Sequence, residues 1–306
     1  MSIDRLTEKI REKKNPTVAG LDARIEYVPE FIQRKNAELY GKTLKAAAES
    51  VYEFNAGLID ALCEVVPAVK PQSAYYELLG PDGAMTLKRT IAYAREKGLY
   101  VITDGKRNDI GETASAYADA YFGGVSFMGE SFEPYSSDGL TVNAYLGSDG
   151  IKPFVKYCED GKSIFVLVKT SNKSSFEVQE MIAGDRPLYR VMAEYINRWG
   201  ADCVGQCGYS NVAAVVGATH PRQLKELRQA HPRIFFLVPG YGAQGGGAAD
   251  VEHAFDGGGG GAVINSSRGI MCAWQKTDGG GKNFKEAAYD AAVKMKRDLQ
   301  AYVVVA

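Results

Sequence analysis

The chain has 306 residues, and its 36 basic and 37 acidic residues give a net charge of −1. Hydrophobic residues make up 45% and charged residues 24%, which is ordinary for a globular protein and excludes a disordered chain. No stretch approaches the roughly 18 uninterrupted apolar residues of a membrane span, and the balanced charge argues against a surface for nucleic acid. We therefore expect no membrane and no nucleic acid among the partners.

The N-terminus and the cysteines both indicate a cytoplasmic location. Residues 1–14 read as a charged amphipathic helix without the apolar centre of a signal peptide. The five cysteines are odd in number and form no CxxC pair, as expected for reduced thiols. Cys203 and Cys207 lie close in sequence, but no histidine is near them, so we expect no metal site.

Short β-rich apolar runs alternate with longer stretches of helical period. Strands are predicted at residues 17–21, 68–71, 100–104, 140–143, 164–169, 213–218, 234–238 and 262–265. Helices are predicted at residues 42–65, 84–97, 112–122, 188–199, 223–229 and 284–301. This alternation requires a parallel sheet, and eight strands predict a single-domain (β/α)8 barrel, the TIM barrel, over residues 1–306. The alternative is a doubly wound open sheet, but its GxGxxG motif is missing after the first strand.

Glycine is the unusual component of the composition, with 34 residues concentrated in runs at 245–247, 257–261 and 279–281. The run at 257–261 precedes the last predicted strand and is interpreted as a flexible connector. The run at 279–281 lies in a loop before the last helix. Neither follows a strand, as a phosphate-binding loop would, so both are interpreted as linkers.

Polar residues gather at the predicted carboxyl ends of the strands, where barrel enzymes hold their active sites. They are Asp22, Lys70, Asp104, Lys106, Asn143, Thr170, Ser171, Gln244, Ser267 and Arg268, and the apolar Pro239 lies among them. Charged groups are costly inside a protein unless they are paired or functional. This set therefore predicts a functional site at that end of the barrel.

The segment Asp104-Gly105-Lys106-Arg107-Asn108-Asp109 is the most informative part of this set. Alternation in an extended chain places Asp104 and Lys106 on one side, with Lys70 of the preceding strand beside Asp104. Asp109 follows at the turn into the next helix, which gives an alternating lysine–aspartate array. Opposite charges about 4 Å apart attract by roughly 4 kcal/mol in such a setting, so the array can be rigid. A purely structural salt-bridge network is the alternative interpretation.

The last two strands carry a second cluster of polar groups. Gln244 lies in a glycine-rich loop that starts at Pro239, and Ser267 and Arg268 follow the eighth strand. Barrels often bind phosphate with the loops after strands seven and eight, and arginine offers a bidentate fork for phosphate oxygens. This cluster therefore predicts a phosphate site.

Eight motifs extend this pattern over nearly the whole chain. They are Gly20-Leu21-Asp22, Lys70-Pro71-Gln72 with Tyr75-Tyr76-Glu77, the segments 104–111, 141–149, 168–172, 216–219 and 239–246, and Asn265-Ser266-Ser267-Arg268-Gly269. In this order they resemble the orotidine 5′-phosphate decarboxylase family, and specifically its longer bacterial branch. Asp-x-Lys-x-x-Asp alone is less specific, because related barrels share it.

The resemblance implies an enzyme of pyrimidine biosynthesis that converts orotidine 5′-monophosphate to uridine 5′-monophosphate and carbon dioxide without a cofactor. It implies that Lys106 donates a proton to carbon 6 of the pyrimidine, that Asp104 lies beside the leaving carboxylate, and that Lys70 orients Asp104 and touches the ribose. The residues fit this chemistry, because a vinylic carbanion needs a nearby cation rather than a metal or an electron sink.

The resemblance also implies how the substrate and a partner subunit contribute. Asp109, Ile110 and Thr113 are implied to come from the partner in a homodimer with shared active sites. The expected substrate contacts within one chain are Asp22 on a ribose hydroxyl, Ser171 with Thr170 on the pyrimidine amide edge, Asn143, and Gln244, Ser267 and Arg268 on the phosphate under the loop that starts at Pro239.

Two other functions remain open from the sequence. One is a sister barrel enzyme that acts on sugar phosphates, shares Asp-x-Lys-x-x-Asp and uses magnesium. The other is a catalytically inactive nucleotide-binding sensor. Activity that survives a chelator would exclude the magnesium-dependent enzyme, and release of carbon dioxide from orotidylate would exclude the inactive sensor.

Overall fold

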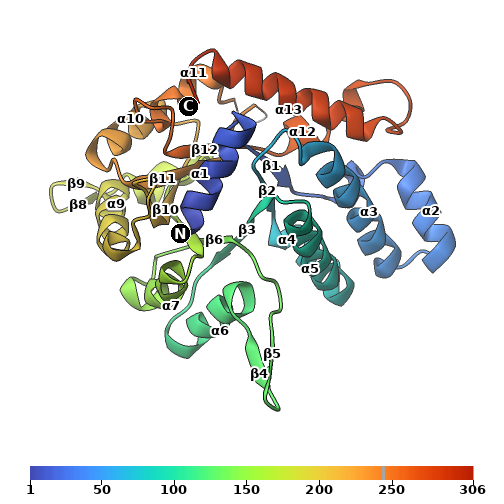
Figure 1. The fold of residues 1–306 in the computed structure, drawn as a ribbon, viewed down its shortest axis with the longest axis horizontal. Helices are drawn as coiled ribbons and strands as arrows, with labels where there is room; N and C mark the ends of the chain where they lie inside the picture. The colour runs from blue at the N-terminus through green and yellow to red at the C-terminus, as the bar shows by residue number, and fades with distance from the viewer. Residues whose placement is uncertain (243–244, 306) are drawn as a thin grey trace.

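A computed structural model describes residues 1–242 and 245–305. Within these residues, parallel strands close into a barrel in the order β1-β12-β11-β10-β7-β6-β3-β2 (Figure 1). The strands are β1 (Thr17–Leu21), β2 (Ala68–Pro71), β3 (Tyr100–Arg107), β6 (Gly139–Val142), β7 (Ser163–Lys169), β10 (Ser210–Val216), β11 (Ile234–Val238) and β12 (Ala262–Ser266). Each of the predicted strands overlaps one of these, and the (β/α)8 barrel is confirmed.

Helices pack around the outside of the barrel (Figure 1). The longer ones are α2 (Glu30–Tyr40), α3 (Leu44–Leu62), α5 (Gly80–Glu96), α6 (Gly111–Phe122), α7 (Ser148–Glu159), α9 (Leu188–Trp199), α10 (Pro221–Ala230) and α13 (Phe284–Gln300). The shorter ones are α4 (Ser73–Glu77), α8 (Phe176–Gln179), α11 (Ala248–Val251) and α12 (Arg268–Met271). Every predicted helix overlaps an observed one. A side-chain cap marks the start of α3, where Thr43 accepts a hydrogen bond from the Ala46 amide.

The N-terminal helix α1 (Ser2–Lys13) closes the amino end of the barrel, where the strands begin. Its apolar residues Ile3, Leu6 and Ile10 are buried against side chains of the barrel interior, including Tyr100 and Phe165. Figure 1 shows α1 lying across the centre of the barrel. The predicted amphipathic helix is thus present, and its apolar stripe covers the interior of the barrel at this end.

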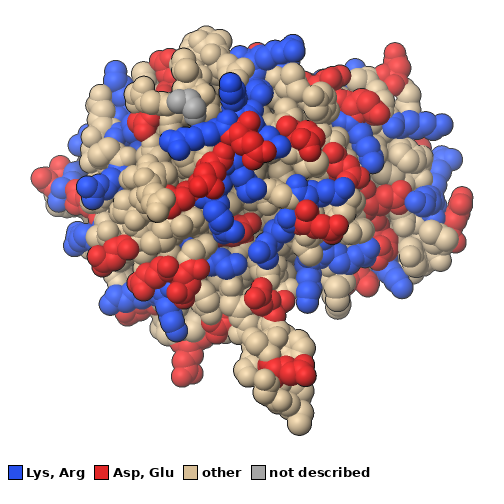
Figure 2. Space-filling view, in the orientation of Figure 1, with Lys and Arg blue, Asp and Glu red and all other residues tan. Residues whose placement is uncertain are grey.

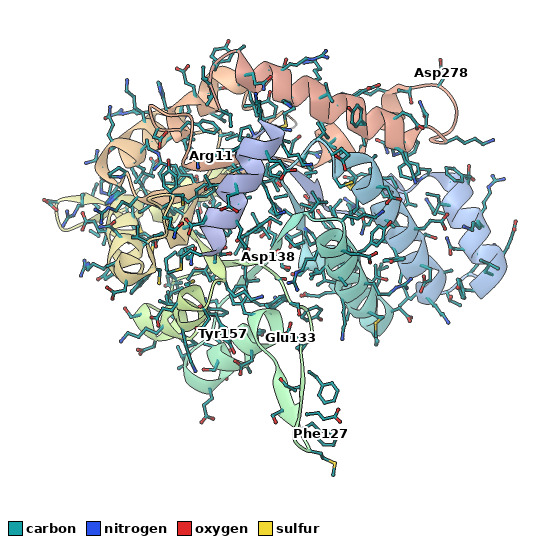
Figure 3. All side chains as sticks on the ribbon, in the orientation of Figure 1. Arg11, Phe127, Glu133, Asp138, Tyr157 and Asp278 are labelled. Atoms are coloured by element: carbon teal, nitrogen blue, oxygen red, sulfur yellow. The ribbon has the colours of Figure 1, made fainter. Side chains whose placement is uncertain are left out.

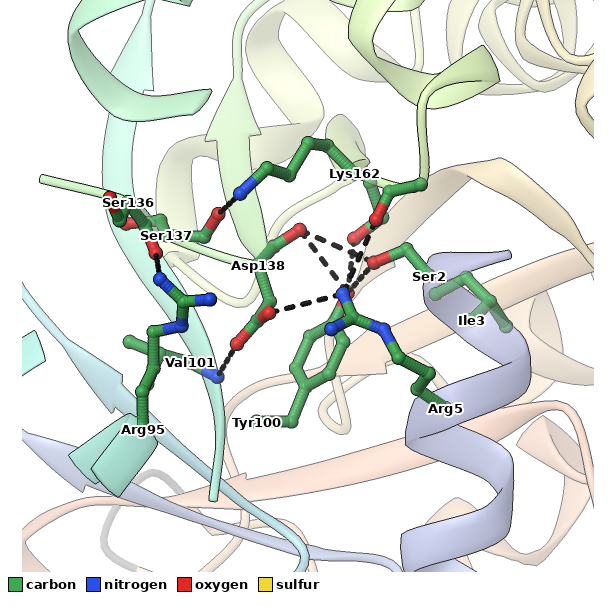
Figure 4. A network of polar contacts seen from close by, with 12 residues as sticks. Ser2, Ile3, Arg5, Arg95, Tyr100, Val101, Ser136, Ser137, Asp138 and Lys162 are labelled. Carbon is green, nitrogen blue, oxygen red and sulfur yellow. Dashed lines mark hydrogen bonds and ion pairs between the residues drawn. The ribbon is translucent and has the colours of Figure 1, made fainter. Parts of the chain in front are cut away.

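A buried polar network joins α1 to the barrel at this amino end (Figure 4). Asp138 precedes β6 and accepts hydrogen bonds from the Val101 amide at 3.0 Å and from the Arg5 guanidinium at 3.1 Å. The hydroxyl of Tyr100 lies 2.6 Å from that of Ser2. Each of these polar groups has a protein partner, so the network fixes the position of α1.

The glycine run 257–261 is a connector, as predicted, but the structure corrects the prediction that it is flexible. It joins the 3-10 helix Glu252–Ala254 to β12, and Asp256 accepts hydrogen bonds from two of its backbone N–H groups, each at 2.9 Å. Gly259 has a φ of +75°, and a Cβ there would lie 1.8 Å from the carbonyl oxygen of Val304. The run is a hydrogen-bonded turn whose second half, from Gly259 to Gly261, is packed too closely for side chains.

A β-hairpin of β4 (Val125–Phe127) and β5 (Glu130–Phe132) projects from the barrel between α6 and β6 (Figures 1 and 3). A second, shorter hairpin pairs β8 (Ile182–Ala183) with β9 (Arg186–Pro187). Figure 2 shows basic and acidic side chains interspersed over one face, which agrees with the net charge of −1. Among the described helices, none has the length and apolar character that a membrane crossing requires.

Candidate active site

Polar side chains surround a cavity of about 650 Å³ at the carboxyl ends of the strands. Most of the residues that the sequence predicts for the site line it, namely Asp22, Lys70, Asp104, Lys106, Thr170, Ser171, Pro239, Ser267 and Arg268. The cavity lies opposite the end that α1 closes. This location is the one that barrel enzymes use for their active sites.

A lysine–aspartate–lysine cluster forms one wall of the cavity. The Lys70 ammonium lies 2.7 Å from one carboxylate oxygen of Asp104, and the Lys106 ammonium lies 2.6 Å from the other. The Thr141 hydroxyl donates a third hydrogen bond to Asp104 at 2.7 Å. The side chains of Lys70 and Asp104 are buried, whereas that of Lys106 is 46% exposed. Lys106 is therefore the member of the cluster that a ligand can reach.

The backbone of β3 explains how Lys106 reaches this position. The register between β3 and β6 shifts between Thr103 and Arg107, and Lys106 has a φ of +45°. Its amide donates a hydrogen bond to the Thr141 hydroxyl at 2.9 Å. Simple strand alternation predicted that Asp104 and Lys106 share a side, but an irregularity held by Thr141 produces the arrangement. A left-handed lysine is a strained conformation of the kind that is common at functional sites.

The charges in this cluster stabilise one another. Burial alone would raise the pKa of Asp104, but the ammonium groups of Lys70 and Lys106 outweigh it and hold that pKa well below its usual range. Burial alone would lower the pKa of Lys70, but Asp104 and Asp22 outweigh it and raise that pKa. Both residues are therefore charged at neutral pH. The Asp22 carboxylate lies 3.9 Å from the Lys70 ammonium and extends the cluster to the end of β1.

The loop after β12 lies against the end of β1. A Cβ on Gly20 would lie 2.0 Å from the Ser267 hydroxyl oxygen, so the two strands approach this closely only because residue 20 is glycine. Arg268 follows Ser267 at the start of α12 and is exposed at the cavity. Gln244, which the sequence predicts for the same cluster, lies outside the described residues.

Four predicted residues do not line the cavity of their own chain. Asp109, Ile110 and Thr113 lie at the start of α6, where Ile110 is 55% exposed and the Asp109 carboxylate accepts a hydrogen bond from the Ile110 amide at 2.8 Å. Within one chain, the lysine–aspartate array therefore ends at Lys106 and excludes Asp109. The side-chain oxygen of Asn143 accepts from the Tyr145 amide at 3.1 Å and stabilises a turn instead.

Several cavity residues were not predicted from the sequence. They are Arg24, Tyr27, Gln72, Tyr75, Thr141, Asn172, Gln179 and Asn265, with the apolar Leu167, Val215 and Leu237 below them. Thr141 had a readable signal, because it is a hydroxyl in a short strand that is otherwise apolar. Gln179 had none, because it lies in an irregular excursion between β7 and α9.

Within residues 1–242 and 245–305, no group of three or more His, Cys, Asp and Glu side chains is arranged to hold a metal ion. Asp22 and Asp104 both face Lys70. Chemistry without a metal stays a prediction, which the chelator experiment below tests.

Fold and site together define a (β/α)8-barrel enzyme with charged groups at the carboxyl ends of its strands. Residues 46–277 match the family described as "Orotidine 5'-phosphate decarboxylase / HUMPS family". The chain belongs to this family, and it is a carboxy-lyase. The resemblance found in the sequence is thereby confirmed.

Relatives and solved structures agree over nearly the full length. The orotidine 5′-phosphate decarboxylase of Rhodopirellula baltica is 42% identical over 301 residues, which are 97% of this chain and 98% of that protein. That of Caldicellulosiruptor bescii is 39% identical and covers 98% of both chains. The structure of OMP decarboxylase from Leishmania donovani is 29% identical, with a TM-score of 0.74 and coverage of 98% of both chains.

Proposed function

We propose that this enzyme decarboxylates orotidine 5′-monophosphate to uridine 5′-monophosphate, as a step of pyrimidine biosynthesis, without a metal or cofactor. The observation that carries the proposal is the half-exposed Lys106 ammonium, held 2.6 Å from the buried Asp104 at the wall of the cavity. The names of the relatives that match the whole chain point to the same reaction.

The proposed reaction needs one cation that is also a proton donor. The bond between carbon 6 and the carboxylate breaks, carbon dioxide leaves, and the electron pair stays on carbon 6. The Lys106 ammonium stabilises this carbanion and gives it a proton, and the neutral amine then recovers a proton from water. A preorganised charge is effective here because the protein, rather than solvent, has already oriented it.

Asp104 and Lys70 set the position of that ammonium. Asp104 is charged and held at both oxygens, because Lys70 donates to one of them and Thr141 donates to the oxygen that Lys106 also contacts. The substrate carboxylate would lie next to Asp104, and the repulsion between them would be relieved as carbon dioxide leaves. Lys70 balances the charge of Asp104 and lies near the proposed ribose site at Asp22.

The other cavity residues would bind the parts of the substrate that do not react. Asp22 would accept a hydrogen bond from a ribose hydroxyl, and Ser171 would face the pyrimidine amide edge. The phosphate would be bound by Ser267 and Arg268, together with Gln244 and the loop that starts at Pro239. Arginine suits phosphate because its fork matches two phosphate oxygens.

We also propose a homodimer in which Asp109, Ile110 and Thr113 complete the site of the partner subunit. Support comes from their place at the start of α6, outside the cavity of their own chain, where Ile110 and Thr113 are exposed and Asp109 is half-buried. Tyr117 lies one to two turns further along the same helix and is also exposed, at 36%. In a two-fold dimer, each chain would contribute the same residues to the other site.

A cytoplasmic location is part of the proposal. All five cysteines are free thiols. Burial raises the pKa of Cys203 and of Cys272 to about 11, which keeps both protonated and unreactive. Free thiols persist in a reducing compartment.

Release of carbon dioxide from orotidine 5′-monophosphate, measured with and without a chelator, tests the reaction. Equal turnover under both conditions is expected. Loss of turnover with the chelator would indicate a magnesium-dependent sister activity. Nucleotide binding without any release of carbon dioxide would indicate an inactive sensor.

Subunit complementation tests the shared site. Lys106→Ala and Asp109→Ala are each expected to be nearly inactive. After the two variants are refolded together, about half of the dimers are mixed, and one site in each mixed dimer is free of both substitutions. Roughly a quarter of all sites should therefore recover full activity. If refolded mixtures show only the summed residual activities, Asp109 acts within its own chain.

A further inference from the structure

A hydrogen-bond cluster at the end of β7 is not used by the chemistry above. Gln179, the last residue of the short helix α8, binds Thr170 at two points. Its side-chain oxygen accepts from the Thr170 amide at 2.9 Å, and its side-chain nitrogen donates to the Thr170 hydroxyl at 2.7 Å. Two bonds between one side chain and one residue fix both the position and the rotation of that residue.

The hydroxyl and the carbonyl oxygen of Thr170 each have a further protein partner. Its hydroxyl donates to the side-chain oxygen of Asn172 at 2.6 Å, and its carbonyl oxygen lies 2.9 Å from the His220 Nε2. Ser171, the next residue, lines the cavity, and no described residue forms a hydrogen bond with its side chain. Thr170 is thus committed to the protein, and Ser171 is the residue that is available to a ligand.

The segment that carries Gln179 is anchored independently of Thr170. Lys169 is fully buried, and its ammonium donates to the Ser175 hydroxyl at 3.1 Å and pairs with the Glu180 carboxylate at 2.9 Å. The hydrogen bond from Lys169 lowers the pKa of Glu180, so the carboxylate of this pair stays charged at neutral pH. The two anchors flank Gln179 in the sequence and hold its helix against the end of β7.

Ser171 is also supported from the opposite side. A Cβ on Gly217, after β10, would lie 2.9 Å from the Ser171 backbone and side chain. The Gly217 amide donates to the Lys169 carbonyl at 2.7 Å. Ser171 therefore lies between a strand that approaches it closely and a neighbour that Gln179 holds in place.

We propose that Gln179 is a positioning residue, which fixes Thr170 and thereby aims Ser171 at the amide edge of a pyrimidine ring. The inference rests on the proposed function, because it takes the ligand to be a pyrimidine nucleotide. It assigns the recognition of the base to Ser171 and makes Thr170 a fixed support. Gln179 then determines selectivity for the base without touching the reacting atoms.

The test compares two ligands that share the ribose phosphate and differ in the base. Dissociation constants of uridine 5′-monophosphate and ribose 5-phosphate are measured by calorimetry on the full-length protein. Gln179→Met keeps the volume of the side chain and removes both hydrogen bonds. Gln179→Glu keeps the bond from the Thr170 amide and offers a second oxygen to the Thr170 hydroxyl. Gln229→Met, at an exposed glutamine of α10, is the matched control.

Gln179→Met is expected to raise the dissociation constant of uridine 5′-monophosphate by roughly three- to tenfold, as is typical for lost hydrogen bonds. The dissociation constant of ribose 5-phosphate should change by less than about twofold. Gln179→Glu should restore most of the lost affinity for uridine 5′-monophosphate, and Gln229→Met should change neither dissociation constant. An equal loss for both ligands, or no loss for either, would overturn the proposal.

A double-mutant cycle with Thr170→Val separates positioning from direct contact. If Gln179 acts through Thr170, the two substitutions together should cost little more than Gln179→Met alone. Additive losses would mean that Gln179 touches the ligand itself, and would overturn the positioning role. Because binding is the readout, the inference can stand if carbon dioxide release fails. Conversely, if carbon dioxide is released but Gln179→Met leaves binding unchanged, the positioning role is wrong and the proposed function stands.

Discussion

Each end of the barrel holds a cationic side chain, but the surroundings of the two cations are opposite. At the amino end, the Arg228 guanidinium donates to the carbonyl oxygens of Ala254, Ile234 and Gly261 at 2.8–2.9 Å and lies 4.0 Å from the ring centre of Phe236. Burial lowers the pKa of Arg228 to about 10, which still leaves it charged. At the carboxyl end, Lys106 has one carboxylate partner and faces an open cavity.

This difference separates structural from functional charge. A cation surrounded by fixed acceptors has no donor left for a ligand, and its loss exposes several buried carbonyls at once. A cation with one fixed partner and open space on the other side can be shared with a substrate. The second half of the glycine turn at 257–261 belongs to the packed amino end, since a Cβ on Gly259 would lie 1.8 Å from the carbonyl oxygen of Val304.

The largest effect is expected from Lys106→Ala. Turnover of orotidine 5′-monophosphate should fall by about 10²–10⁴-fold or more, because the variant lacks both the proton donor and the stabilising charge. Nucleotide binding should remain measurable, and the melting temperature should change little. Lys294→Ala, on the exposed face of α13, is the control. A variant that retained more than about a tenth of wild-type activity would contradict the role of Lys106.

Arg228→Met tests the opposite end of the barrel. The substitution should cost about 3 kcal/mol of stability, because several buried carbonyls lose their donor. For a protein of 306 residues, the melting temperature should fall by about 5 °C. Turnover well below that temperature should be unchanged. If turnover fell while stability was kept, Arg228 would not be the structural counterpart of Lys106.

Arg268→Ala is expected to have a smaller and more selective effect. Activity on the phosphorylated substrate should drop by about 10–150-fold, since a hydrogen bond to a charged group contributes roughly 1.5–3 kcal/mol. Activity on the bare nucleoside orotidine should change far less. Arg222→Ala, at an exposed arginine of α10, is the control. Equal losses on both substrates would place Arg268 outside the phosphate site.

Much of the carboxyl end could be predicted from the sequence, for a geometric reason. Parallel strands of a closed barrel end at the same edge, so residues at successive strand ends become neighbours. This logic placed Lys70 beside Asp104, and the structure confirms the contact at 2.7 Å. It gave no account of the irregular backbone at Lys106 or of the hydroxyl of Thr141 that holds it.

The amino end was harder to predict, because it depends on packing rather than on strand order. Glycine composition does not distinguish a loose connector from the packed turn at 257–261. Arg228 had a readable signal, since it lies four residues after the buried Leu224 on α10 and so falls on the same buried face. Gln179 and the excursion around it have neither strand order nor helical period, and only the structure reveals their contacts.

The smallest predicted effect also belongs to the amino end and depends on pH. Asp4 accepts a hydrogen bond from the Cys207 amide at 2.8 Å and lies 3.2 Å from the terminal amino group. Burial alone would raise the pKa of Asp4, but these hydrogen bonds outweigh it and lower that pKa to about 2. Because the folded-state pKa lies below that of the unfolded chain, near 4, the charged form stabilises the fold above about pH 4.

Asp4→Asn keeps an oxygen for the Cys207 amide and removes the charge. At pH 7, its free energy of unfolding should be lower than that of the wild type by at most about 1 kcal/mol. The difference should narrow as the pH falls below about 4 and vanish only below the folded-state pKa of about 2, where the wild-type carboxyl is protonated in both states. Denaturant unfolding at pH 7, 4 and 3 measures this trend. If the difference in free energy of unfolding stays constant with pH, Asp4 acts through packing rather than through its charge. If turnover at pH 7 changes, the amino end of the barrel is not independent of the active site at the carboxyl end.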